Sequence, residues 1–349
     1  MADPAVARLT VDLDALAHNH AVLRREAIGA EVAPVVKSDG YGLGAVPVAR
    51  RLWAEGARSF FVARLTEGEA LRSGLGPERP AAIYVLDGLT KGAGPRLAAA
   101  GLTPVISSLA QAAEADPGPL TLQVETGMNR QGLTIDQARS LSARPVDLVI
   151  SHLGSAAELD DPRSAQQLEL FGAARAIFPH ARASLAASAG VFRGPAYRFD
   201  LVRPGISLYG GGPMERHDDR LRAVATLAAP ILDIRDLKAG DRVGYGASVA
   251  VHRPTRMAVV GAGYADGVIR ASRARGYAWF AGARRALLIV NMDLLAIDLG
   301  DAEARAGDMV ELLGPNVRLD DLAAAAGTVA HEVLVRLSLR AERRYIGQA

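Results

Sequence analysis

The sequence predicts an N-terminal (β/α)8 barrel of the TIM type, followed by a C-terminal domain that is mostly β. Up to about residue 210, short apolar runs alternate with helical stretches rich in alanine, leucine and arginine, as in a parallel sheet covered by helices. Eight such units occur, the number that closes a barrel. From about residue 221, strand-like runs are separated only by turn signals. We therefore expect one domain over residues 1–218 and a second over residues 219–349.

The barrel strands are expected at continuous apolar runs, because both faces of such a strand are covered. In chain order these runs are "APVVK" (33–37), "FFVA" (60–63), "AIYVL" (82–86), "TPVIS" (103–107), "LTLQVE" (120–125), "DLVIS" (147–151), "RASLA" (182–186) and "VRPGIS" (202–207). The second domain has strand-like runs at "TLAAPILDI" (226–234), "RMAVVGAGY" (256–264), "ALLIVNMDLLAIDL" (286–299) and "MVELLG" (309–314). A short capped helix is expected at "LDDLAAAAG" (319–327).

Composition argues against several classes of protein. A net charge of +2 and an aromatic content of 5% give no basis for binding nucleic acid. The absence of cysteine excludes thiolate catalysis, disulfides and thiolate metal sites. No apolar run is long enough to span a bilayer, and no signal peptide is recognisable, so we expect a cytoplasmic protein without membrane contacts. "HNH" (18–20) is expected on a solvated helix surface rather than at a metal, because residues two apart do not face each other.

A lysine at the tip of the first strand is the most informative single residue. Only Lys37, Lys91 and Lys238 are lysines among the 40 basic residues, so arginine supplies nearly all the positive charge. Lysine, unlike arginine, can lose its proton when burial lowers its pKa, and it can then attack a carbonyl group. The alternative is an ordinary strand-end lysine that extends into water.

Polar residues gather at the expected carboxyl ends of the barrel strands, where chemistry occurs in this architecture. They are Lys37, Arg64, Asp87, Ser107, Glu125 with Arg130 just beyond, His152, Ser188 and Arg203. Phosphate sites form after strands seven and eight, and the loops there, "LAASAG" and "RPGIS", are built from small residues. An activatable lysine beside a phosphate site fits a phosphorylated carbonyl cofactor, and pyridoxal phosphate meets that description.

A competing motif points to another enzyme class. "GYGLGA" (40–45) matches the loose glycine fingerprint of dinucleotide-binding folds, which would make the protein a nicotinamide-dependent dehydrogenase. The eight-strand count disfavours an open sheet, and no acidic residue lies directly at the tip of the second strand. The dehydrogenase interpretation is therefore the weaker one.

Taken together, the motifs resemble the alanine racemases over nearly the whole chain. "VDLDALAHN" is similar to the family's opening helix, and "VVKSDGYGLG" to its pyridoxal-lysine segment. "ETGMNRQG", "SHLGSA", "LAASAG", "VRPGISLYG", "VGYGASV", "GYADG" and "NMDLLAIDL" resemble further segments of the family. The resemblance implies that Lys37 is the Schiff-base residue and one catalytic base, with Tyr245 as the second. It also implies contacts to the cofactor from Tyr41, His152, Ser188, Arg203, Gly205 and Ile206, and contacts to the substrate from Arg130, Tyr264 and Met292.

The implied function is the interconversion of L- and D-alanine by two bases on opposite faces, supplying D-alanine for peptidoglycan. The implied assembly is a head-to-tail homodimer in which one subunit's β domain closes the other's barrel. Three positions depart from the family pattern, namely Gln123 in place of a lysine that is often carbamylated, Ala187 in place of an asparagine, and Leu339 in place of a tyrosine. A broad-specificity racemase, a decarboxylase of the same fold and a non-catalytic pyridoxal phosphate carrier remain as alternatives. The carrier leaves about 130 C-terminal residues without a role.

Overall fold

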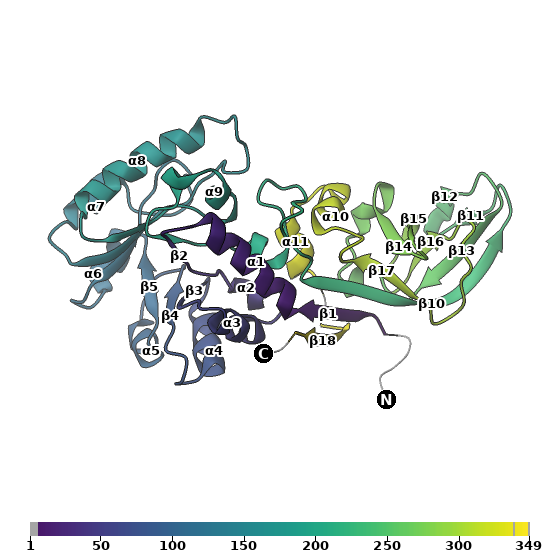
Figure 1. The fold of residues 1–349 in the computed structure, drawn as a ribbon, viewed down its shortest axis with the longest axis horizontal. Coiled ribbons are helices and arrows are strands. Elements are labelled where there is room, and N and C mark those ends of the chain that lie inside the picture. Colours follow the sequence, from purple (N-terminus) through teal and green to yellow (C-terminus); the bar gives the residue numbers. More distant parts are fainter. Residues whose placement is uncertain (1–5, 338, 348–349) are drawn as a thin grey trace. The chain divides into compact units, whose positions relative to one another are not determined.

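The computed structural model describes residues 6–337 and 339–347, which divide into two compact units (Figure 1). The barrel unit comprises Ala17–Leu208. The β unit combines the described residues up to Leu16 with those from Tyr209 onward. The first segment belongs to the β unit because strand β1 (Arg8–Asp12) pairs there with two other strands. This division differs from the expected one, in which residues 1–218 form a single domain. The assignment of cofactor binding to residues 1–218 and of the second catalytic base to residues 219–349 stays a prediction.

The barrel unit contains eight short parallel strands within its described residues. They are β2 (Glu31–Val32), β3 (Ser59–Val62), β4 (Ala82–Val85), β5 (Thr103–Ile106), β6 (Leu120–Gln123), β7 (Val146–Ile150), β8 (Arg182–Ser184) and β9 (Leu201–Val202). Strands β3 to β8 form one sheet in sequence order, and β2 pairs with β9. Parallel bridges Val35↔Phe61 and Ala187↔Arg203 join the two sheets at both seams. The predicted barrel is therefore confirmed.

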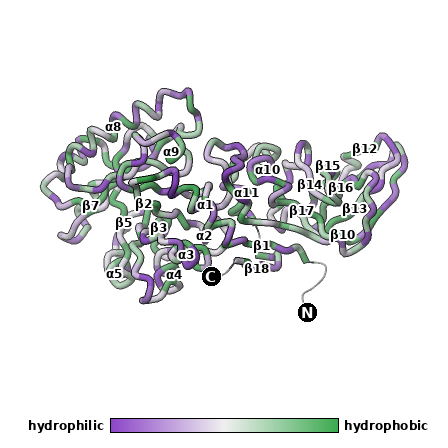
Figure 2. Tube along the Cα trace, in the orientation of Figure 1, coloured by the Kyte–Doolittle hydropathy of each residue, from purple (hydrophilic) through white to green (hydrophobic). Residues whose placement is uncertain are grey.

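Helices lie between the strands and around them, as the alternating sequence predicts (Figure 1). They are α1 (Leu13–Glu26), α2 (Lys37–Tyr41), α3 (Ala45–Ala54), α4 (Leu65–Leu75), α5 (Gly94–Ala99), α6 (Leu109–Glu114), α7 (Ile135–Ser140), α8 (Arg163–Ile177) and α9 (Ser188–Phe192), with 3₁₀ turns η1 (Pro195–Tyr197) and η2 (Ile206–Tyr209). The hydrophobic colours gather in the strand region, and the outer loops are mainly hydrophilic (Figure 2). The core includes the fully buried Phe60 and Phe61.

The first barrel strand lies at residues 31–32, before the predicted 33–37, and the last covers residues 201–202 instead of 202–207, because proline interrupts each ladder. Pro34 and Pro204 have no N–H to donate, so regular pairing ends at Val32 and Val202. The chain stays extended beyond those points through single hydrogen bonds, from Val35 N to Pro204 O (2.9 Å) and from Val36 N to Phe61 O (2.9 Å). Lys37 consequently lies at the start of a turn rather than at the end of a strand.

The β unit is mainly antiparallel. Its strands are β1, β10 (Ala225–Leu237), β11 (Arg242–Val243), β12 (Val249–Ala250), β13 (Thr255–Val260), β14 (Tyr277–Phe280), β15 (Ala283–Val290), β16 (Leu295–Asp298), β17 (Met309–Leu313) and β18 (Glu342–Ile346). The larger sheet runs β13-β16-β15-β14-β17-β10-β1-β18, and β10 pairs with β13 as well, so six strands close a ring. The helices are α10 (Leu319–Ala326) and α11 (Ala330–Val335), with 3₁₀ turns η3 (Tyr245–Ala247), η4 (Tyr264–Asp266) and η5 (Arg270–Ala274). The helix expected over 319–327 is thus confirmed, and it ends at Gly327 with φ 68°.

Helix α1 buries part of the "HNH" motif, which we expected to be solvated. His20 is only 2% exposed, and its Nε2 has no hydrogen-bond partner among the described residues. Burial, assisted by the charge of Arg24 and opposed by that of Glu55, lowers the pKa of His20 from 6.5 to about 4. The prediction of a solvated surface is therefore wrong for His20, which is a neutral core histidine.

No helix in the described part of the chain is both long and apolar enough to cross a membrane.

The neutral His20 should make the protein less stable in mild acid. The unfolded state takes up a proton below pH 6.5, whereas the folded state does so only near pH 4. Stability that is fully present above pH 6.5 is therefore lost as the pH falls, by on the order of 2 kcal/mol at pH 5. Urea unfolding at pH 7.5 and pH 5 should show this loss, and His20→Gln should lack it. His18→Gln, on the same helix, is the control, and equal pH dependence in both variants would contradict the assignment.

Candidate active site

A left-handed turn follows Lys37 at the carboxyl end of the first barrel strand. Ser38, Asp39, Gly40 and Tyr41 have φ of 53°, 53°, 63° and 58°. This conformation costs roughly 1–2 kcal/mol for each residue other than glycine. Hydrogen bonds hold the turn, from Ser38 N to Glu67 Oε1 and from Ala45 N to Asp39 Oδ1, both 2.8 Å. The strain is thus maintained by specific contacts, as is common at functional sites.

The environment of Lys37 lowers the pKa of its amine. Burial is the main cause that lowers its pKa, and the positive charge of Arg130 acts in the same direction. Glu67 and Asp87 oppose the shift without reversing it. A neutral amine is the nucleophilic form of lysine, so the structure supports the chemistry predicted for this position.

Arg130 lies in a tight loop after strand β6. The loop is closed by hydrogen bonds from Leu133 N to Gln123 O and from Glu125 N to Leu133 O, both 2.8 Å. Partial burial raises the pKa of Glu125, but hydrogen bonds from the backbone N–H groups of residues 127–130 outweigh it and keep the pKa low. Gly132 is required here, because an added Cβ would lie 2.7 Å from Glu125 N.

Gln123 is 7% exposed and stabilises this loop through its side chain. Its Nε2 donates to Gln131 O at 2.9 Å, and Gln131 Nε2 donates to Ser107 Oγ at 3.0 Å. Within the part of the chain that the structure describes, the Arg130 guanidinium makes no hydrogen bond, so it is available to an anion.

The loops after strands β8 and β9 form an anion cradle. Ser188 Oγ accepts hydrogen bonds from Gly205 N (3.0 Å) and Ser207 N (3.2 Å). Ser207 is fully buried, and its Oγ has no hydrogen-bond partner among the described residues. A Cβ at Gly205 would lie 2.1 Å from the hydroxyl of Tyr41, which is itself 5% exposed and has a pKa raised by burial. The predicted residues Tyr41, Ser188, Gly205 and the adjoining buried Ile206 therefore lie together.

Arg203 is a buried guanidinium at the barrel seam. It donates to Ser184 O (2.9 Å), to Ser184 Oγ and to Ser151 O. Burial lowers its pKa to about 10, so it stays protonated at neutral pH. His152 follows Ser151 directly, and its carbonyl accepts from Gln167 Nε2 at 3.0 Å. Arg203 follows β9 and His152 follows β7, so both lie at the carboxyl ends of barrel strands that flank β8.

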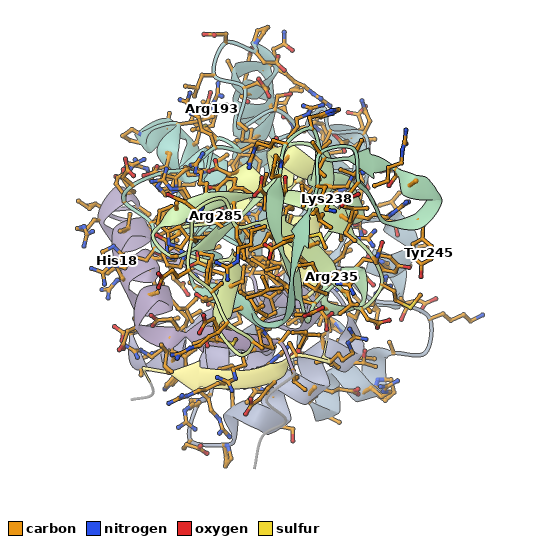
Figure 3. The ribbon with its side chains drawn as sticks, turned by 90° about the vertical axis from the view of Figure 1, so that its right-hand side faces the viewer. His18, Arg193, Arg235, Lys238, Tyr245 and Arg285 are labelled. Carbon is orange, nitrogen blue, oxygen red and sulfur yellow. The ribbon has the colours of Figure 1, made fainter. Side chains whose placement is uncertain are left out.

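The β unit carries the remaining predicted residues on exposed turns. Tyr245 is 86% exposed in the loop between β11 and β12, and it projects away from the strands (Figure 3). Tyr264 and Met292 are 44% and 53% exposed, and their loops are joined by hydrogen bonds from Tyr264 N to Asn291 O and from Ala265 N to Met292 O, both 2.9 Å.

Comparison with known proteins identifies the family. Residues 11–213 match the family model described as "Alanine racemase, N-terminal domain", and residues 224–345 match "Alanine racemase, C-terminal domain". The chain belongs to the alanine racemase family. The family predicted from the sequence motifs is therefore confirmed.

Members of the alanine racemase family resemble the chain over nearly its full length. A biosynthetic alanine racemase of Agrobacterium fabrum is 41% identical over 99% of this chain and 95% of its own length. A catabolic alanine racemase of Mesorhizobium japonicum is also 41% identical, over 98% of this chain and 94% of its own length. The alanine racemase of Bartonella henselae, solved with covalently bound pyridoxal phosphate, superposes with a TM-score of 0.90 at 32% identity, covering 98% of this chain and 100% of that one.

Several residues that shape the site were not singled out from the sequence. Glu67 binds the Lys37 turn, and its signal is a capping box, since its Oε2 also accepts from Arg64 N at the start of α4. Ser151 and Ser184, which hold Arg203, are buried strand-end serines without a distinctive pattern. Asp266 and Arg340 of the β unit are paired across 74 positions of the sequence, a separation that leaves no local signal.

The contact between Gly205 and Tyr41 yields a test of the cradle. Gly205→Ala should lower the free energy of unfolding by roughly 1–3 kcal/mol, the usual cost of overpacking, because the hydroxyl of the buried Tyr41 must move. Adding Tyr41→Phe should restore part of the loss, which urea unfolding of the single and double variants would measure. Gly172→Ala, in helix α8 with nothing within 4 Å of the new Cβ, should be neutral or stabilising. Purely additive effects of the two substitutions would contradict this packing.

Proposed function

We propose that this chain interconverts L- and D-alanine, with pyridoxal phosphate held in the barrel unit and with Lys37 and Tyr245 as the two bases. The observation that carries the proposal is the half-buried amine of Lys37, whose pKa is lowered by burial and by the charge of Arg130, in a barrel that also brings Ser188, Gly205 and Ser207 together. Family membership supports pyridoxal phosphate-dependent racemisation of alanine, and nothing in the comparisons favours a decarboxylase. The proposed biological role is to supply D-alanine for peptidoglycan, and the proposed location of the protein is the cytoplasm.

The residues of the barrel unit fit this cofactor. The buried Ser207 Oγ has no hydrogen-bond partner among the described residues, and the backbone at Gly205 approaches Tyr41 too closely for a Cβ; a nearby phosphate group would account for both features. Ser188, Gly205, Ile206 and Tyr41 would hold the phosphate, and Arg203 and His152 would lie along the ring. Because a guanidinium never accepts a hydrogen bond, Arg203 would leave a facing ring nitrogen unprotonated. When bound, pyridoxal phosphate supplies the electron withdrawal that makes the α-proton of an amino acid acidic.

Racemisation removes the α-proton on one face and returns a proton on the other, so two bases on opposite faces suffice. Lys37 Nζ would serve one face, and burial together with the charge of Arg130 lowers the pKa of this amine. The Tyr245 hydroxyl would serve the other face. In each direction one residue takes up the proton that leaves Cα and the other donates one, so the total number of bound protons is unchanged.

Arg130 would bind the substrate carboxylate, since its guanidinium is free of internal hydrogen bonds and can form a bidentate pair. Tyr264 and Met292 would contact the substrate from the β unit. The exposure of Tyr245, Tyr264 and Met292 supports the proposed head-to-tail homodimer, in which a second copy's barrel would cover these side chains.

Replacing Lys37 should abolish both racemisation and covalent attachment of the cofactor. The reason is that Lys37 is half-buried beside Arg130, whereas Lys91 is exposed in the loop after β4 and Lys238 lies between β10 and β11 of the β unit. Borohydride reduction followed by peptide mass spectrometry should find the pyridoxyl group on Lys37 in the parent protein and nowhere in Lys37→Ala. Lys238→Ala is the matched control and should keep full activity. A pyridoxyl group on Lys91 or Lys238 of the parent protein would overturn the assignment.

Removal of the Tyr245 hydroxyl should stop proton transfer on one face of the substrate and leave proton transfer on the other face. Tyr245→Phe should lose racemisation by roughly 10²–10⁴-fold, the usual worth of a general base. Lys37 should still exchange the α-proton of one enantiomer with solvent deuterium, and the family resemblance implies that this enantiomer is D-alanine. Mass spectrometry of both enantiomers in deuterium oxide measures the difference. Equal loss of exchange for both would show that Tyr245 does not serve a single face.

Mixed dimers test whether the site is shared. In a heterodimer of Lys37→Ala and Tyr245→Phe chains, a shared arrangement gives one site with both changes and one with neither. Mixing the two inactive proteins should then restore activity, up to about half the parent level per heterodimer. Inactive heterodimers would place Tyr245 in its own subunit's site.

A further inference from the structure

Arg340, near the end of the described chain, joins two loops of the β unit. Its Nε and Nη2 donate to Asp266 Oδ1 (2.8 Å) and Oδ2 (2.7 Å), and its Nη1 donates to Asp293 Oδ1 (2.6 Å). The Asp266 side chain is 4% exposed, whereas those of Arg340 and Asp293 are 45% and 60% exposed. The hydrogen bonds to Asp266 and then Asp293 raise the pKa of Arg340 above its ordinary value. One guanidinium thus uses three donors on two carboxylates.

Each of these carboxylates lies next to a residue proposed to face the substrate. Asp266 closes the 3₁₀ turn that begins at Tyr264, and its Oδ2 also accepts from Gly263 N at 2.8 Å. Asp293 follows Met292 directly. The two loops are in backbone contact, since a Cβ on Gly263 would lie 2.3 Å from Asn291 O. A shift of either loop would therefore move both Tyr264 and Met292.

The two carboxylates of Asp266 and Asp293 together require arginine at position 340. A carboxylate as buried as Asp266 is costly unless it is paired and hydrogen-bonded, and the flat guanidinium satisfies both its oxygens at once. The same group reaches Asp293 through its remaining nitrogen, which a lysine ammonium, a single point charge, cannot reproduce in the same geometry. The exposed Asp293 contact adds little to global stability, so its value lies in fixing the loop.

We propose that Arg340 is a positioning residue that fixes the Tyr264 and Met292 loops and thereby sets the affinity for the amino-acid substrate. The inference rests on the proposed roles of Tyr264 and Met292. It extends them to a residue that contacts neither substrate nor cofactor. The exposed Leu339, which departs from the family pattern, precedes Arg340 directly, so the same anchor fixes the segment that presents this side chain.

Steady-state kinetics of the pyridoxal phosphate-loaded enzyme tests the inference. Arg340→Lys and Asp293→Asn should raise KM for L-alanine and D-alanine, by about tenfold and threefold respectively, with kcat within about threefold, because contacts equal in ground and transition states act on KM alone. The cofactor absorbance should not change. A merely structural role would instead lower the amount of active protein and leave KM unchanged. Arg336→Lys is the matched control, since the side chain of Arg336, at the end of α11, pairs with the exposed Glu332 and should leave KM unaltered.

Two further variants separate this inference from the proposed function. Tyr264→Phe and Met292→Ala should each raise KM if those residues contact the substrate. If they do so while Arg340→Lys and Asp293→Asn leave KM within twofold of the parent, the positioning role of Arg340 is overturned and the proposed function stands. If neither Tyr264→Phe nor Met292→Ala changes KM, the substrate-side assignment fails, and the inference about Arg340 fails with it.

Discussion

The buried guanidinium of Arg203 is the constraint on which the active end of the barrel depends. A desolvated charge must be hydrogen-bonded, and here backbone carbonyls of Ser184 and Ser151, at the ends of β8 and β7, accept its donors. Its own N–H donates to Ala186 O at 2.8 Å, within the bridge that closes one seam. The next residue, Pro204, accepts from Val35, two positions before Lys37. Closure of the barrel, the electrostatics of the site and the position of the reactive lysine are therefore linked through the backbone and side chain of Arg203 and the backbone of Pro204.

A second constraint is the lack of space between the left-handed turn after Lys37 and the segment that follows β9. Tyr41 comes within reach of Gly205 only because the chain after Lys37 turns left-handed and because Gly205 has no Cβ. The cost of that backbone conformation is offset by hydrogen bonds that the carboxylates of Glu67 and Asp39 accept from backbone N–H groups. Since the same fold half-buries Lys37, local strain and a lowered pKa have a common origin in the tight packing of this end.

The sequence predicted the barrel well because a strand covered on both faces is a continuous apolar run, as "FFVA" shows. The sequence was less informative where contacts between distant segments decide which strands form and to which unit they belong. Strand β1 was not predicted as part of the β unit, because its pairing with β18 joins the two ends of the chain. Strand β18, "ERRYI", is partly exposed and highly charged, so it lacks a hydrophobic pattern. The site residues came largely from motif resemblance, whereas Arg340 and its partners required coordinates, because contacts over such separations leave no local signal.

The contrast between arginine and lysine in this chain has a physical basis. Arginine occupies the positions where a fixed charge or a planar set of donors is needed, in the buried seam at Arg203 and between two carboxylates at Arg340. Both arginines stay protonated in these environments, and their geometry would be lost with lysine. Position 37 needs the opposite property, an amine that releases its proton when burial and Arg130 disfavour the charge. The division follows from pKa: burial first, and then a neighbouring arginine that keeps its own charge, both lower the pKa of the one amine that can release its proton.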